Sequence, residues 1–189
     1  MNAKNAARLF IQLGNQQADT NSGDGMTNLR LNKLLYFAQG QSLAKRNRPL
    51  FDDQIVAWDF GPVVPSVYYS YKGFEKNFIK DVPPDRELFE DDDITLLLDV
   101  YNTAKSLSTS RLVDLSHKAG APWDIVYNQN GEKGGVIQQE SIRDYFSMHP
   151  FCSRTFSDAI ETLKKKAYTP ERDENDVPII PRGLAYDWN

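Results

Sequence analysis

Few residues in this sequence could perform catalysis, and one short segment brings three of them together. Asp114 and His117 stand three positions apart in a segment expected to be helical, so both would lie on one face. A carboxylate that orients an imidazole is half of a catalytic relay, and Ser116 is a candidate nucleophile beside them. Adjacent helical residues point in different directions, however. We therefore interpret His117 as structural or interfacial, and a hydrolase built on it is the weakest hypothesis.

Recognised metal and phosphate motifs are absent from the sequence. It has two histidines and one cysteine, and none of the HExxH, CxxC or HxH spacings occurs. The acidic run Glu90–Asp93 fits the start of a helix, where negative charge is favourable, and it lacks the alternating ligands of a calcium loop. The glycines in residues 131–135 are not followed by the Lys-Ser/Thr pair of a phosphate-binding loop. We expect no metal, no cofactor and no enzymatic activity.

The composition is typical of a cytoplasmic protein. Apolar residues make up 40% of the 189 residues, enough for a core without disulfides or a metal. The single Cys152 cannot form an internal disulfide, which fits a reducing compartment. Residues 1–10 lack the apolar run of a signal peptide, and nothing approaches the ~20 apolar residues that span a bilayer. We expect a cytoplasmic location and no membrane association.

Charge is distributed unevenly along the chain. Residues 1–50 carry seven basic and two acidic side chains, whereas residues 51–100 carry four basic and twelve acidic ones. These two quarters either compensate each other in the fold or leave an acidic face for a basic partner. The overall charge of −4 argues against general nucleic-acid binding. The basic first quarter and the cluster Lys164–Lys166 still support an alternative function, a nucleic-acid-binding regulator of a prophage or mobile element.

Hydrophobic spacing predicts that most of these residues are positioned by helices. Ala6, Leu9, Phe10 and Leu13 follow the spacing of one helix face, and that helix is expected to end near Gly14. Further helices are expected around Leu31–Ala38, Val67–Tyr71, Ile94–Tyr101, Leu112–Leu115, Pro122–Tyr127, Ile142–Phe146 and Phe156–Lys166.

The second of these helices is expected to be buried on more than one side. Thr27 or Asn28 can cap it, Tyr36 and Phe37 broaden its apolar stripe, and Pro49 stops it. Short β runs are expected at residues 55–60, ended by Gly61-Pro62, and at residues 136–137. The fold prediction is a mainly α (α+β) compact single domain of about six to eight helices with a small two- to three-stranded β element.

Aromatic residues concentrate in one segment of the chain. Large aromatic side chains are over-represented at interface hot spots, although most would also fit a core. Because so many occur together, we expect a few of them to face outward. They fall within twenty-one residues and are Trp58, Phe60, Tyr68, Tyr69, Tyr71, Phe74 and Phe78.

Three motifs resemble the signature of the Panacea antitoxin family (SocA-like, phage-associated GepA-like). The first is KLLYFAQG at residues 33–40, and the second is AWDFGPVVPSVY at residues 57–68. The third is Leu115-Ser116-His117 with Pro122-Trp123 following, and Gly135-Val136-Ile137 leads into the last matching helix. The resemblance covers roughly residues 5–148. We predict a Panacea-like antitoxin domain over 1–148 and a C-terminal helix and extended tail over 149–189, a specificity segment or protease handle.

This resemblance implies an antitoxin that neutralises a cognate protein toxin, encoded nearby, by direct contact. In some members a AAA+ protease would receive the bound toxin. The family brings no catalytic residues, and the oligomeric state is left open. The candidate partner-binding residues are Trp58, Phe60, Pro62, Val63, Tyr68, Tyr71, His117 and Trp123.

Overall fold

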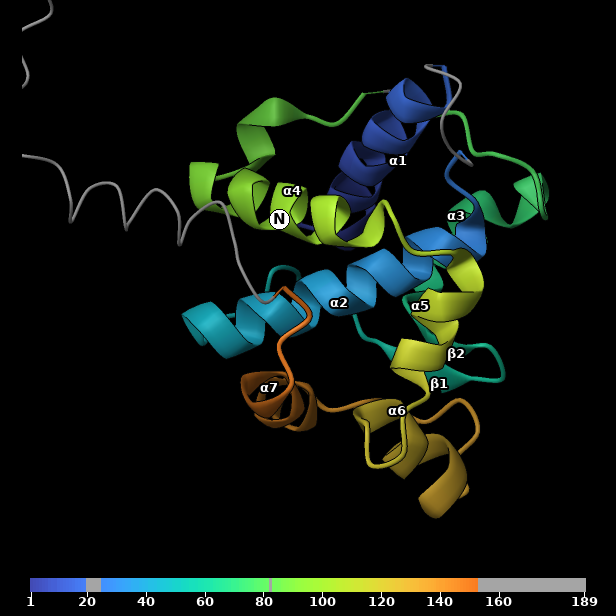
Figure 1. Cartoon of the computed structure of the whole chain (residues 1–189), viewed down its shortest axis with the longest axis vertical. Coiled ribbons are helices and arrows are strands. Elements are labelled where there is room, and N and C mark those ends of the chain that lie inside the picture. The colour runs from blue at the N-terminus through green and yellow to red at the C-terminus, as the bar shows by residue number, and fades with distance from the viewer. Residues whose placement is uncertain (20–24, 82, 153–189) are drawn as a thin grey trace, which may run out of the picture. The chain divides into compact units, whose positions relative to one another are not determined.

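The computed structural model describes residues 1–19, 25–81 and 83–152 (Figure 1). Over these residues the chain forms seven α-helices and one two-stranded sheet, which confirms the predicted mainly α fold. None of the described helices is both long and apolar enough to cross a bilayer. The elements are α1 (Ala3–Asp19), α2 (Asn28–Arg46), β1 (Val56–Trp58), β2 (Gly61–Val63), α3 (Pro65–Tyr71), the 3-10 turns η1 (Lys72–Phe74) and η2 (Arg86–Leu88), α4 (Asp91–Ala104), α5 (Thr109–Ser116), α6 (Pro122–Asp124), the π-helical turn η3 (Ile125–Gln129) and α7 (Gln139–Met148).

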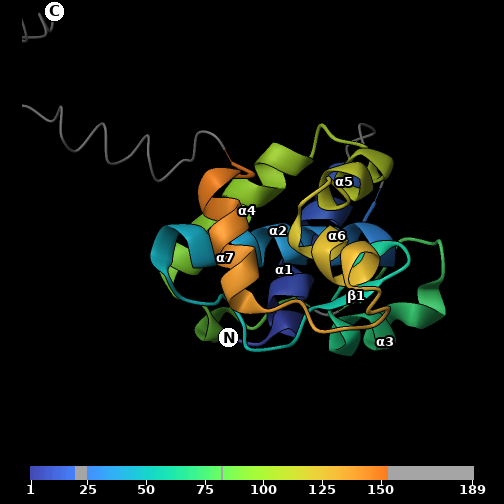
Figure 2. The same cartoon turned by 90° about the horizontal axis from the view of Figure 1, so that it is seen from below.

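Helix α2 is the central element of this part of the chain. Helices α1, α3, α4, α5 and α7 and strand β2 all contact it (Figure 2). Thr27 caps its start, where the hydroxyl accepts a hydrogen bond from the backbone N–H of Arg30, and Asn47 caps its end in the left-handed conformation. Fifteen of its nineteen residues are buried, which confirms that this helix is buried on more than one side.

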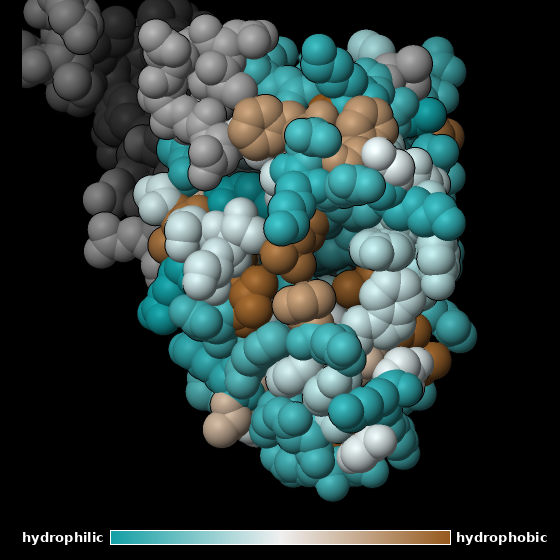
Figure 3. Space-filling view, turned by 90° about the vertical axis from the view of Figure 1, so that its right-hand side faces the viewer, coloured by the Kyte–Doolittle hydropathy of each residue, from teal (hydrophilic) through white to brown (hydrophobic). Residues whose placement is uncertain are grey.

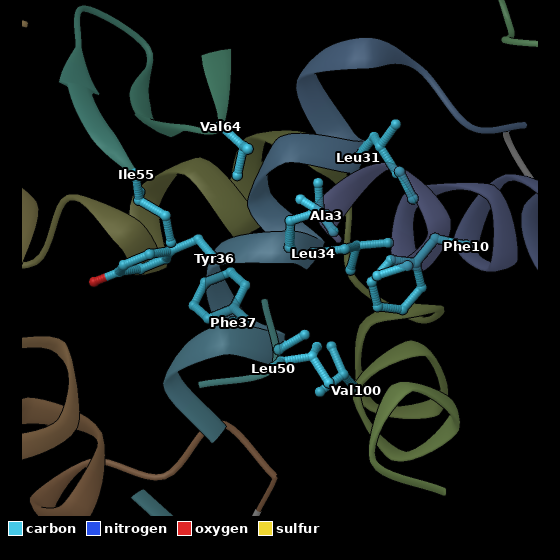
Figure 4. Close-up of a cluster of buried hydrophobic side chains, with 14 of the residues drawn as sticks. Ala3, Phe10, Leu31, Leu34, Tyr36, Phe37, Leu50, Ile55, Val64 and Val100 are labelled. Atoms are coloured by element: carbon cyan, nitrogen blue, oxygen red, sulfur yellow. The ribbon is translucent and has the colours of Figure 1, made fainter. Parts of the chain in front are cut away.

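The core is assembled around the apolar side chains of α2. Leu34 and Phe37 of α2 meet Phe10 of α1 and Val100 of α4 in one cluster (Figure 4). The prediction that the first helix ends near Gly14 is wrong, because α1 continues to Asp19. The missing side chain of Gly14 leaves room for Met26, whose Cε lies 3.0 Å from the position that a Cβ would take. Packing therefore outweighs the low helix propensity of glycine.

The small β element is an antiparallel hairpin with a two-residue turn. Trp58 pairs with Gly61, which places Asp59 and Phe60 in the turn. Gly61 and Pro62 therefore begin β2, whereas the sequence predicted that they end a strand. The strand predicted at residues 136–137 is reduced to a single bridge between Val136 and Val56.

The oppositely charged quarters of the chain pair with each other. Three arginines from the first fifty residues contact carboxylates from the next fifty, so compensation within the fold accounts for part of the charge pattern. The Lys164–Lys166 cluster and the helix predicted at residues 156–166 lie outside the described residues. The pairs are Arg8–Asp81 at 3.2 Å, Arg46–Asp93 at 2.7 Å and Arg48–Glu90 at 2.7 Å.

Candidate functional site

The turn of the hairpin holds an apolar side chain in solvent. Phe60 is 71% exposed, and its neighbour Asp59 accepts a hydrogen bond of 2.6 Å from the hydroxyl of Tyr127. Gly61 follows with φ +100°, a conformation that favours glycine. A Cβ at Gly61 would also lie within 2.9 Å of three side-chain atoms. Both conformation and space therefore require glycine at this end of the turn.

Those three atoms come from two helices and meet at one point. They are Nζ of Lys33 in α2, Oγ of Ser116 at the end of α5 and Nε2 of His117. We call Lys33, Gly61, Ser116 and His117 the Gly61 cluster. Lys33 is fully buried and its Nζ donates a 2.9 Å hydrogen bond to the carbonyl oxygen of Pro62. Burial lowers the pKa of Lys33 from 10.5 to about 7, so this amine loses its proton near neutral pH.

A stack of three aromatic rings is hydrogen-bonded to the hairpin. The rings of His117 and Trp123 are 3.8 Å apart and nearly parallel, and Tyr127 stacks on the other side of Trp123 at 4.7 Å. The indole N–H of Trp123 donates a 2.8 Å hydrogen bond to the carbonyl oxygen of Trp58. Together with the bond from Tyr127 to Asp59, this stack fixes the turn that carries Phe60.

Within the described residues, the arrangement around His117 is not that of a catalytic relay. In this part of the chain no hydrogen bond joins the side chains of Asp114 and His117, and Ser116 donates its own hydrogen bond of 2.8 Å to the carbonyl of Val113. Burial, and then the charge of Lys33, lowers the pKa of His117, although nearby carboxylates oppose this. No group of histidine, cysteine and carboxylate side chains suited to a metal occurs over the same residues. This geometry supports the structural interpretation of His117.

An apolar groove of about 480 Å³ opens beside Phe60 (Figure 3). It lies between the first turn of α2, the hairpin and α3. The ring of Trp58 packs edge-on against Tyr68 at 4.9 Å and against Tyr69 at 6.0 Å, which gives the groove an aromatic wall. The lining residues are Asn28, Leu29, Asn32, Trp58, Phe60, Val63, Tyr68, Lys72, Glu75 and Lys76.

The surface around the groove is unusually apolar for this protein. Six large apolar side chains are clearly exposed in the described residues, and three of them gather here: Leu29, Phe60 and Tyr69. Leu29 and Phe60 line the groove, while Tyr69 contacts its aromatic wall. Exposed apolar surface of this kind marks sites of interaction with other molecules.

The predicted partner-binding residues fall into two groups. Trp58, Phe60, Val63 and Tyr68 line the groove. The other four do not line it. Tyr71 is 3% exposed and donates a hydrogen bond to Asp81, while Pro62, His117 and Trp123 belong to the hairpin and its support.

Several residues of this site were not found from the sequence. Leu29 and Asn28 of the first turn of α2 line the groove, and so do Lys72 and Lys76 beyond α3. Lys33 was not predicted to be a site residue. A helix that is buried on several sides must also bury some of its polar side chains, and this argument could have identified Lys33 as a buried lysine.

Comparison with known proteins places the chain in a family. A family model described as "Antitoxin SocA-like, Panacea domain" matches residues 31–124. The Antitoxin SocA of Caulobacter vibrioides is 35% identical over 140 residues, which cover 64% of this chain and 72% of that protein. This chain belongs to the SocA-like Panacea antitoxin family. No solved structure matches it.

The structure brings the three Panacea motifs together in one place. Lys33 comes from the first motif, Gly61 from the second, and Ser116 and His117 from the third, and they form the Gly61 cluster. All four lie within the region that the family model matches. The Panacea signature in this chain therefore builds and supports the hairpin that borders the groove.

Proposed function

We propose that this Panacea protein is an antitoxin that neutralises a cognate protein toxin, encoded nearby, by direct contact at the groove beside Phe60. Family membership supports the antitoxin role. The observation that carries the contact surface is the exposed Phe60 beside an apolar groove of about 480 Å³. An aromatic residue on a rigid turn is a strong interface anchor, because little conformational freedom is lost when it is covered.

The first quarter of the chain supports this proposal over a nucleic-acid-binding regulator. Five of its seven basic side chains are engaged within the fold, which leaves little free basic surface there. Arg30 donates hydrogen bonds of 2.8 Å to the carbonyls of Ala104 and Leu107, at the C-terminal end of α4. Lys33 is buried, and three other arginines of this quarter pair with carboxylates. A phosphate backbone needs such charges on the surface.

Two modes of neutralisation fit a direct complex. In the first, the bound antitoxin blocks the working surface of the toxin. In the second, it delivers the toxin to a AAA+ protease. The half-life of the toxin in cells with and without the antitoxin distinguishes the two modes, because only delivery to a protease shortens that half-life. In the delivery mode, removal of the protease restores the longer half-life.

The proposal is tested by co-expression with the product of the neighbouring gene. Native protein is expected to restore growth and to co-purify with the toxin. Phe60→Ser is expected to lower affinity at least about tenfold, as hot-spot substitutions do. Met148→Ser is the matched control, since Met148 is 72% exposed and does not line the groove.

Two outcomes would contradict the proposal at different levels. If native protein fails to neutralise the neighbouring gene product, the antitoxin assignment is wrong for that pair. If Phe60→Ser and Met148→Ser neutralise equally well, the groove is not the contact surface.

A further inference from the structure

The floor of the groove has little polar capacity left for a ligand. The Asn28 side chain donates to the carbonyl of Tyr68 at 3.0 Å. The Asn32 amide donates to Asn28, and its side-chain oxygen accepts from the backbone N–H of Val64 at 2.9 Å. Because these amides are already committed within the fold, the floor favours an apolar group.

The rim beyond α3 carries charge that the fold does not neutralise. Lys72 and Lys76 are exposed and line the groove, with Glu75 between them. Within the described part of the chain, none of these three side chains forms an ion pair. The Lys72 ammonium lies 5.6 Å from the centre of the Tyr69 ring, at the aromatic wall. The rim therefore presents a net positive charge beside an apolar hollow.

We infer that the groove binds a segment of the toxin that carries a large apolar side chain flanked by carboxylates, with the apolar group in the hollow and the carboxylates at Lys72 and Lys76. This inference rests on the proposed function and adds the chemistry of the partner. A groove of about 480 Å³ is in the range of sites that enclose a compact group, ~300–1,000 Å³. Covering a lysine with an apolar surface is costly unless a negative group replaces its water, so the partner must supply one.

The acidic second quarter of the chain does not reverse this preference. Asp81, Glu90 and Asp93 contact arginines, and Asp59 in the turn accepts the hydroxyl of Tyr127. Asp59 keeps its charge but does not line the groove, whose charged lining residues are Lys72, Glu75 and Lys76. A basic segment would meet two like charges there and only one opposite charge.

Two synthetic peptides test the inference without knowledge of the toxin. Both contain the same Phe and Leu anchors, and they differ only in having Glu or Lys at the flanking positions. Fluorescence anisotropy with the full chain is expected to show tighter binding of the Glu peptide, by about tenfold at low salt. The double variant Lys72→Glu/Lys76→Glu is expected to reverse this order, and Glu75→Gln to strengthen binding of the Glu peptide.

The matched control is Lys4→Glu/Lys105→Glu, which makes the same change in net charge at exposed lysines that do not line the groove. This variant is expected to bind both peptides as the native chain does. Equal binding of the two peptides, absence of binding, or equal effects of the two double variants would overturn the inference.

Toxin neutralisation separates this inference from the proposed function. If Lys72→Glu/Lys76→Glu still neutralises the toxin as well as the control variant does, the partner chemistry is wrong and the antitoxin role stands. If the native chain itself does not neutralise the toxin, the proposed function fails, whatever the peptides show.

Discussion

Lys33 lies in an environment that opposes its ordinary chemistry, because it is fully buried. An ammonium group is costly to bury, and among the described residues its Nζ donates only to the carbonyl oxygen of Pro62. The pKa of about 7 expresses that cost, because burial favours the neutral amine. The hydrogen bond of this long side chain links the N-terminal third of α2 to the second strand of the hairpin. We regard Lys33 as a positioning residue for the surface that carries Phe60.

The lowered pKa of Lys33 predicts a specific dependence of stability on pH. The unfolded chain binds a proton at Lys33 up to about pH 10.5, whereas the folded chain releases it near pH 7. Between these values the unfolded state holds more protons, so the free energy of unfolding rises with pH. At ~1.4 kcal/mol per pKa unit, the gain from pH 7 to pH 9 is about 2–3 kcal/mol. Below about pH 6 both states hold the proton, so the cost is complete and changes no further.

Urea unfolding of native protein and Lys33→Met at several pH values measures this effect. Other titrating groups are common to both proteins, so the difference in their free energies of unfolding isolates Lys33. That difference is expected to change between pH 7 and pH 9 and to be flat below about pH 6. Parallel curves over the whole range would show that Lys33 stays charged in the folded state.

How far the sequence predicts individual residues depends on how local their role is. His117 was interpreted as structural or interfacial because a helix cannot present Ser116 to it, and its stacking on Trp123 supports that view. The convergence of Lys33, Ser116 and His117 on Gly61 joins positions far apart in the sequence. Periodicity contains no information about such contacts, so the cluster could not be predicted from it.

At the scale of elements, the hairpin shows where turn chemistry misled the prediction. Gly61-Pro62 ordinarily ends a strand, yet here it begins β2, because a two-residue turn reverses the chain just before it. Proline is tolerated in a short edge strand, which needs few N–H donors. The helices were easier to predict, since their apolar stripes repeat locally, and α2 was recognised with its burial on several sides.

The tight contact between the hairpin and α2 predicts the effect of one methyl group. Gly61→Ala adds both backbone strain, at φ +100°, and contact with Nζ, Nε2 and Oγ atoms within 2.9 Å. Gly120→Ala is the matched control, because its φ is +76° and nothing lies within 4 Å of the added Cβ. The control is expected to cost about 1–2 kcal/mol from strain alone. Gly61→Ala should cost at least ~1 kcal/mol more through crowding.

Thermal and urea unfolding of the two variants measure these costs. Toxin binding by the folded fraction is expected to fall for Gly61→Ala only, because the crowded side chains support the turn that carries Phe60. Equal destabilisation by the two substitutions would mean that the side chains of the Gly61 cluster can move aside for the added methyl group without loss of stability.

At the scale of the whole molecule, composition alone does not decide whether the basic and acidic quarters of the chain pair with each other or face a partner. Arg8, Arg46 and Arg48 reach carboxylates 42 to 73 positions along the chain, which only the folded topology could reveal. The buried pair is the one between Arg46 and Asp93, whose side chains are 16% and 6% exposed. It joins the end of α2 to the start of α4, where Asp93 also lies in the favourable first turn.

The packed part of the chain extends a few residues beyond the end of α7. The proposed division after residue 148 follows the extent of the family resemblance, yet the chain continues to pack beyond α7. Phe151 stacks on Phe37 at 4.1 Å, and Cys152 is 2% exposed in the core. Gln41 ties this segment to α2, since its oxygen accepts from the N–H of Phe151 at 3.3 Å. Residues 149–152 therefore contribute to the stability of this unit.

Two shortened chains test where this unit ends. A chain of residues 1–155 keeps these contacts and is expected to melt within about 2 °C of the full-length protein. A chain of residues 1–148 loses the burial of Phe151 and Cys152, which is worth about 2–4 kcal/mol. For a domain of this size that loss lowers Tm by roughly 5–15 °C. Differential scanning calorimetry measures both, and equal melting of the two chains would place the boundary at residue 148. We expect the 1–148 chain to melt at a lower temperature than the 1–155 chain. That result would place the boundary after Cys152, because Phe151 stacks on Phe37 of α2.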